Sequence, residues 1–287
     1  MRIITDLHCT EYGAPGHPER PERISKTVEK LRSQSEVPLA WVQPMEVEEG
    51  SLMRAHSAGH LKELESSQDF DADTPAYPGI ARHARWSVGG ALEALRCARE
   101  GQMAFSLLRP PGHHATRNRA MGFCYLNSVA IAALEAREAG FKRVAVYDFD
   151  VHHGNGTEEI LLDKPGFAFI SIHQHPAYPG TGQTDRGSNC FNFPVRPFIP
   201  RAEYRATLDR SLEVLKRFQP DLVAVSAGFD AYRADPLANG TLESEDFHWL
   251  GQSMRGLGLP VVNILEGGYS AELPELILAY LRGLEGR

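Results

Sequence analysis

The sequence has few cysteines, no long apolar run and no cluster of basic residues, and each absence excludes a class of protein. Its four cysteines (Cys9, Cys97, Cys124 and Cys190) form no CxxC pair. A chain of this length needs no disulfide framework, so we expect reduced thiols and a cytoplasmic protein. No apolar run approaches the ~18 residues that a membrane helix requires, and no signal-like segment follows Met1, which indicates a soluble, unexported chain.

The charge balance argues against a nucleic-acid partner. Thirty basic residues face 37 acidic ones, which gives a formal net charge of −7, and no stretch concentrates Lys and Arg enough to track phosphates. Apolar residues make up 42% and charged residues 23% of the chain, which is ordinary globular usage and excludes a disordered or coiled-coil protein. No linker or repeat divides the 287 residues, so we predict a single domain over 1–287.

Short apolar runs rich in Val, Ile, Phe and Ala alternate with helical patterns or loops. Runs of four to eight apolar residues without alternation are typical of strands buried on both faces of a parallel sheet. The predicted strands are 104–108, 144–147, 167–172, 222–226 and 261–265, and the predicted helices are 82–100, 127–138 and 203–218. This order predicts a single open, mostly parallel α/β sheet with helices on both faces. Such sheets bind ligands beyond the carboxyl ends of their strands, so we expect the active site there.

The segment after the second predicted strand has the pattern of a metal site. In an extended chain, Asp148, Asp150 and His152 share one face. A catalytic zinc commonly takes three nitrogen or oxygen ligands and leaves one position open, so a further ligand is needed. Asp230, at the end of another strand, is the best candidate. The alternative is that these acids cap helices or pair with arginines, but buried at a strand end they would be costly without a cation.

Two further segments at the same expected edge carry catalytic residue types. His113 and His114 follow a Pro-Pro-Gly turn, and one of them could act as a base on a metal-bound water. The alternative is a structural role, although two adjacent histidines make poor core residues. Tyr269 follows two glycines that permit a close backbone approach, so its hydroxyl could enter the same space; otherwise it is an ordinary loop tyrosine.

Taken together, these motifs resemble the zinc-dependent histone deacetylase family, which has the arginase-deacetylase fold, and in particular its class II-like bacterial amidohydrolases. The resemblance covers nearly the whole chain and implies one deacetylase catalytic domain. The matching segments are 17–23 (HPERPER), 109–114 (RPPGHH), 122–127 (GFCYLN), 148–156 (DFDVHHGNG), 228–230 (GFD) and 266–269 (EGGY).

The resemblance implies one catalytic zinc per chain, bound by Asp150, His152 and Asp230. It implies that Asp148 is not a zinc ligand but contributes, with Ser171, to a structural potassium site. The ligand types alone do not select the metal, because two carboxylates and an imidazole also suit iron(II) or cobalt. A binuclear manganese hydrolase of the ureohydrolase type is disfavoured, because the visible carboxylates suffice for one ion.

The resemblance also implies the catalytic roles. His114 is the general base and later the acid, and His113, held by Asp148, is its electrostatic neighbour. Asn155 is a neutral partner that should leave His114 less basic than a carboxylate would. Tyr269 donates a hydrogen bond to the scissile carbonyl oxygen. The implied reaction is amide hydrolysis by metal-activated water.

The implied substrate site is a narrow channel for an acyl-lysine side chain. Its walls are Gly122, Phe123 and Tyr178, and apolar walls suit an aliphatic stem. Asp73 lies on the rim and accepts N–H groups of a peptide, and Arg23 lines an inner pocket that receives acetate.

The position of Leu237 bears on the substrate. Polyamine-selective relatives place a glutamate there, so a cationic polyamine would lack an acidic partner in this chain. We therefore expect removal of acetyl or short acyl groups from Nε-acetyl-lysine in a peptide or protein. An acetylpolyamine or another small acetylamide is the alternative substrate. A non-catalytic module that binds acyl-lysine is the alternative from another class, but it would need neither His114 nor Tyr269.

Overall fold

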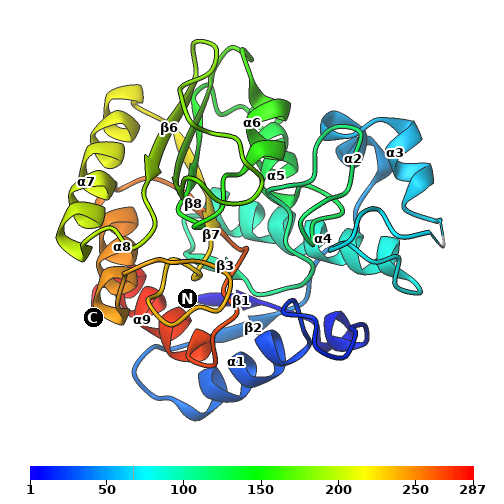
Figure 1. The fold of residues 1–287 in the computed structure, drawn as a ribbon, viewed down its shortest axis with the longest axis horizontal. Coiled ribbons are helices and arrows are strands. Elements are labelled where there is room, and N and C mark those ends of the chain that lie inside the picture. The colour runs from blue at the N-terminus through cyan, green and yellow to red at the C-terminus, as the bar shows by residue number, and fades with distance from the viewer. Residues whose placement is uncertain (67) are drawn as a thin grey trace.

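A sheet of eight strands runs through the centre of the computed structural model, which describes residues 1–66 and 68–287 (Figure 1). The strand order is β2-β1-β3-β8-β7-β4-β5-β6, and each neighbouring pair is parallel. The strands are β1 (Arg2–Ile4), β2 (Ala40–Val42), β3 (Ala104–Ser106), β4 (Val144–Asp148), β5 (Phe167–Gln174), β6 (Cys190–Val195), β7 (Leu222–Ala227) and β8 (Val261–Leu265). The predicted open parallel α/β sheet is therefore confirmed.

The apolar runs of the sequence form the interior strands β3, β4, β5, β7 and β8. Every residue of β4, β5, β7 and β8 is buried, which is why these strands read as continuous apolar runs. The first run extends two residues beyond the end of β3 at Ser106. The sequence pattern missed β1, β2 and β6, because β1 and β2 have only 3 residues each and the edge strands β2 and β6 have partly exposed side chains.

Helices cover both faces of the sheet, as predicted (Figure 1). On one face α4 and α5 pack against the central strands; on the other α7 packs against β4, β5 and β6, while α9 packs against both α8 and α1. The helices are α1 (Glu22–Ser33), α2 (Glu49–Ala55), α3 (Ala58–Glu63), α4 (Ile80–Arg99), α5 (Ser128–Glu138), α6 (Asn155–Leu161), α7 (Arg201–Phe218), α8 (Ser244–Gly256) and α9 (Leu273–Glu285), with a 3₁₀ turn over Leu7–Thr10. The three predicted helices correspond to α4, α5 and α7.

Residues at the helix ends account for three of these boundaries. The Asn127 side chain caps α5 by accepting a hydrogen bond from the Ala130 N–H. Helix α7 begins after Pro200 and ends at Gln219, whose left-handed φ of 53° breaks the helical repeat. The buried stripe of α7 includes Leu208, Leu212 and Leu215.

The carboxyl ends of the central strands lie level with one another. Asp148 of β4 pairs with Ser171 of β5 on one side and with Ser226 of β7 on the other. Ala227 of β7 in turn pairs with Leu265 of β8. The segments that follow these strands therefore leave the sheet at one edge, where parallel sheets bind ligands.

Two further observations concern the solvent environment of the chain. Each of the four cysteines is buried as a free thiol. Within residues 1–66 and 68–287, no helix combines the length and the hydropathy needed to cross a membrane. The cytoplasmic location stays a prediction.

Candidate active site

Three side chains at the carboxyl edge of the sheet form a potential metal-binding group. Asp150, His152 and Asp230 each offer one ligand atom, and these atoms lie within 4.8 Å of one another. His152 Nδ1 lies 3.0 Å from Asp230 Oδ2 and 3.2 Å from Asp150 Oδ1. Both carboxylates are fully buried. Burial and the charge of Asp150 raise the pKa of Asp230. A pair of buried acids with an imidazole suits a divalent ion, which supplies the missing positive charge.

Backbone N–H groups orient the two carboxylates. Asp150 Oδ2 accepts the Gly267 N–H at 2.7 Å, and Asp230 Oδ1 accepts the Val151 N–H at 2.9 Å. Position 267 also requires glycine, because a Cβ there would lie 2.2 Å from Asp230 Oδ2. The two carboxylates are thus held by the loops that follow β4 and β8.

Asp148 lies behind this group and contacts His113. Its Oδ2 is 3.0 Å from His113 Nδ1, and its Oδ1 accepts the Asp150 N–H at 3.1 Å. Burial favours the neutral form of His113, but the charges of Asp148 and Asp150 outweigh it and raise the His113 pKa to about 10. His113 therefore carries a positive charge at neutral pH. Ser171, predicted to contribute to a potassium site, directs its hydroxyl at His173 Nδ1, 2.9 Å away.

His114 is oriented for proton transfer by Asn155. Its Nδ1 lies 2.8 Å from the Asn155 amide oxygen, which can only accept, so Nδ1 carries the proton and Nε2 keeps its lone pair. Burial and then the charges of His113 and His152 lower the pKa of His114 well below its usual value. The rings of His113 and His114 lie 4.0 Å apart. His114 is thus a neutral imidazole beside a charged one.

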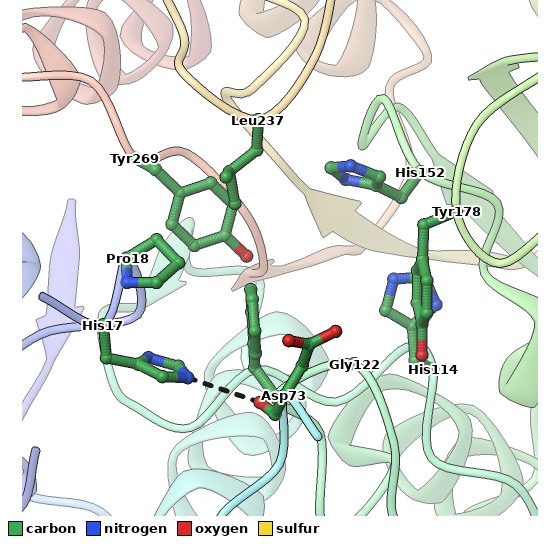
Figure 2. A pocket seen from close by; sticks show the side chains of 10 residues that line it. His17, Pro18, Asp73, His114, Gly122, His152, Tyr178, Leu237 and Tyr269 are labelled. Atoms are coloured by element: carbon green, nitrogen blue, oxygen red, sulfur yellow. Dashed lines mark hydrogen bonds between the residues drawn. The ribbon is translucent and has the colours of Figure 1, made fainter. Parts of the chain in front are cut away.

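A cavity of about 260 Å³ opens above these groups (Figure 2). In Figure 2 the Tyr269 hydroxyl points into this cavity, and His114, His152 and Tyr178 lie across from it. Burial raises the pKa of Tyr269 well above its usual value, so its hydroxyl remains a hydrogen-bond donor at neutral pH. The lining residues are His17, Pro18, Asp73, His114, Gly122, Phe123, His152, Tyr178, Leu237 and Tyr269.

The cavity walls depend on a glycine. Gly122 has a φ of +57°, and a Cβ there would lie 2.6 Å from His114 Cδ2 and 2.8 Å from Tyr178 Cε1. Phe123 also adopts a positive φ, and its N–H donates to Thr74 Oγ1 at 3.1 Å. A side chain at position 122 would therefore collide with His114 and Tyr178 and narrow the cavity between them.

The rim residues Asp73 and Leu237 both line the cavity, whereas Arg23 does not. The Asp73 carbonyl accepts from His17 Nε2 at 3.3 Å, and the Asp73 carboxylate points toward the cavity mouth (Figure 2). Arg23 is buried behind Tyr269, with its guanidinium carbon 4.8 Å from the Tyr269 ring centroid. Its Nε donates to the Gly268 carbonyl at 2.7 Å. The predicted contact of Arg23 with acetate stays a prediction.

Sequence reasoning missed the role of Glu266. This fully buried carboxylate accepts the N–H groups of Gly112 at 2.7 Å and of His113 at 3.1 Å. Burial raises its pKa to about 7. Glu266 thereby holds the turn that presents both histidines. The signal in the sequence was an acid directly after a buried strand. His17 and Pro18, which line the cavity, were also missed as site residues.

The chain is similar over nearly its whole length to known proteins. Residues 17–284 match the family described as the histone deacetylase domain. A probable deacetylase of Methanothermobacter thermautotrophicus is 39% identical over 98% of this chain and 90% of its own length. A histone deacetylase-like amidohydrolase of Pseudomonas aeruginosa is 37% identical over 95% of this chain and 78% of its own. The crystal structure of an acetylpolyamine aminohydrolase from Burkholderia pseudomallei superposes with a TM-score of 0.90 at 29% identity, covering 99% of this chain and 98% of that one.

Proposed function

This chain belongs to the histone deacetylase family and is a deacetylase, and we propose that its substrate class is Nε-acetyl-lysine or a similar short-acyl amide in a peptide or protein. We further propose that residues 1–287 form one catalytic domain. The observation that carries the proposal is a single cavity that is lined by His114, His152 and Tyr269 together with Gly122 and Phe123. An apolar channel that ends at polar groups suits an aliphatic stem with an amide at its tip.

Asp150, His152 and Asp230 are the residues that would hold a catalytic zinc, as is typical of the family. When bound, zinc polarises the amide carbonyl and lowers the pKa of water. The proposal includes a structural potassium near Asp148 and Ser171, which face each other in the register of β4 and β5. A buried carboxylate beside two strand ends offers the oxygen ligands that such an ion prefers.

In the proposed reaction, residues of this chain move the proton and stabilise the developing charge. His114 Nε2 takes a proton from the attacking water, while Asn155 holds the ring through Nδ1. Tyr269 donates a hydrogen bond from its hydroxyl to the carbonyl oxygen as that oxygen gains negative charge. The charge of His113 disfavours a long-lived protonated His114, which helps His114 pass the proton to the leaving amine. The C–N bond then breaks, and acetate and a free amine leave.

Replacing Tyr269 with phenylalanine tests the oxyanion role. We expect kcat to fall by about 10²- to 10³-fold, because one preorganised donor is lost while the fold and the metal ligands remain. The measurement is acetate release at saturating substrate, with bound zinc determined on the same samples. Tyr178→Phe, which removes a hydroxyl from the opposite wall, serves as the control and should change kcat little. Near-normal turnover by Tyr269→Phe would remove this hydroxyl from the mechanism.

A comparison of two substrates tests the proposed substrate class. We expect acetate release from an acetyl-lysine peptide to exceed release from an acetylated polyamine, because Leu237 offers a cation no partner. Leu237→Glu should raise kcat/KM for the polyamine roughly fivefold, since a charge pair at 4 Å in water contributes about 1 kcal/mol. Leu7→Glu, at a leucine that is 45% exposed against 39% for Leu237, is the matched control.

The two other outcomes of this comparison would contradict the proposed substrate class. A wild-type preference for the polyamine would favour the small-acetylamide alternative. Cleavage of neither amide by a protein that binds zinc tightly would contradict the proposed substrate class and favour a module that only binds acyl-lysine.

A further inference from the structure

Asp235 connects the two loops that carry Leu237 and Tyr269. Its Oδ2 accepts the Tyr269 N–H at 2.7 Å and the Ser270 N–H at 3.2 Å. Its Oδ1 accepts the Leu237 N–H at 3.0 Å. The side chain lies in the loop after β7 and is only 6% exposed. One buried carboxylate thus binds the backbone of two neighbouring residues that line the cavity, Leu237 and the hydroxyl donor Tyr269.

The two residues before Tyr269 make backbone hydrogen bonds of their own, which do not involve Asp235. The Gly267 N–H donates to Asp150, and the Gly267 carbonyl accepts the Phe229 N–H at 3.0 Å. The Gly268 carbonyl accepts from Arg23. These contacts end one residue before Tyr269, and Gly268, with a φ of +119°, has no side chain to restrict rotation of the chain at that point.

The Tyr269 side chain is buried, at 8% exposed, between two neighbouring groups. Its ring packs edge-on against Phe123, with 5.8 Å between centroids, and lies 4.8 Å from the Arg23 guanidinium carbon. The two N–H bonds to Asp235 are the ones that set the backbone from which this side chain projects.

We infer that Asp235 is a positioning residue that holds Tyr269 in line with the reacting carbonyl and ties that position to the wall at Leu237. The inference rests on the proposed function, because it gives the Tyr269 hydroxyl its catalytic task. A carboxylate suits the position, since both of its oxygens accept and bonds to a charged acceptor are stronger than neutral ones. An asparagine of the same shape would turn an N–H against one of the two groups of donors.

A double-mutant cycle with Tyr269 tests this inference. We expect Asp235→Asn to lower kcat roughly 10- to 10²-fold, because the acceptor loses its charge and its amide N–H faces one of the two groups of donors. KM and bound zinc should change little. In the Tyr269→Phe background the same substitution should have almost no further effect, since there is no hydroxyl left to position. Asp209→Asn, at an exposed aspartate of α7, is the matched control.

A second measurement follows Tyr269 without turnover. In protein with ¹³C-labelled tyrosine rings, the NMR signal of Tyr269 is assigned by its loss in Tyr269→Phe. We expect that signal to shift or broaden in Asp235→Asn and to stay unchanged in Asp209→Asn. If Asp235→Asn does not fold, Asp235→Glu, which keeps both acceptor oxygens but displaces them, takes its place in both experiments.

The outcomes separate this inference from the proposed function. An unchanged Tyr269 signal, or an equal loss of kcat in both backgrounds, would overturn the role of Asp235. Absence of turnover by the wild-type protein contradicts the proposed function instead, and the Tyr269 signal still decides what Asp235 does.

Discussion

Replacing Asp230 with alanine is expected to remove both the bound zinc and the acetate-releasing activity. Asp230 supplies one of three ligand atoms that lie within 4.8 Å of one another, and its second oxygen accepts the Val151 N–H. With only two protein ligands left, the site should bind zinc too weakly to retain it in water. Since Lewis-acid stabilisation is worth several kcal/mol, turnover should fall by about 10³-fold or more. Mass spectrometry of desalted protein measures the zinc, and acetate release measures the activity.

Two further variants separate the loss of a ligand from the loss of packing. Asp230→Asn keeps the side-chain shape and an oxygen that can accept the Val151 N–H, so it should fold normally while still losing zinc. Asp209→Ala removes an exposed carboxylate from α7 and should leave zinc and turnover unchanged.

Chelation provides an independent check of the same ligand set. An ion that binds only the folded state raises the melting temperature. A chelator should therefore lower the melting temperature of the wild type and leave the melting temperature of Asp230→Ala unchanged. An Asp230→Ala protein that keeps one zinc per chain would refute the ligand assignment.

Replacing His114 with alanine is expected to lower kcat by about 10² to 10⁴, the usual contribution of a positioned general base. The His114 imidazole is neutral, its Nδ1 is bonded to Asn155, and it lines the cavity beside His152. Of the other histidines that line the described part of the cavity, His152 belongs to the metal-binding group and His17 contacts the Asp73 carbonyl. Zinc content should be unchanged, since His114 is not a ligand. Single-turnover acetate release with bound substrate measures the chemical step.

His17 offers a matched control, because it is a histidine of the same cavity. His17→Ala removes a hydrogen bond to the Asp73 carbonyl and should raise KM more than it lowers kcat. A fall in kcat as large as that of His114→Ala would show that the loss does not report on proton transfer. Normal turnover by His114→Ala together with inactive His113→Ala would move the base role to His113.

The interior of the fold could be predicted because its chemistry is local. Strands β4, β5, β7 and β8 are buried on both faces, so each must be apolar throughout, and this is visible in the sequence without knowledge of its neighbours. Edge strands obey no such rule. β2 has an exposed Trp41 and β6 has partly exposed residues, so neither has a continuous apolar run.

The residues of the candidate site could be predicted where they lie close together in the sequence. Asp150 and His152 could be paired from their spacing along one segment, but the prediction that Asp148 shares their face fails, because the chain bends at 150–152 and Asp148 contacts His113 instead. Asp230 could be named because parallel strands end at one edge. Asp235 and Glu266 could not be given roles, because their partners lie about 34 and more than 150 residues away along the chain.

The sequence by itself determined the parallel sheet, the edge at which its polar segments meet and the residue types available there, since these depend on strand burial and on the spacing of side chains along one segment. Only the tertiary structure decided which distant groups touch: that a Cβ at position 122 would clash with both His114 and Tyr178, and that buried acids hold the loops of the two histidines and of Tyr269. The physical reason is that hydrogen bonds act over about 3 Å, a distance that distant segments reach only when the core has packed.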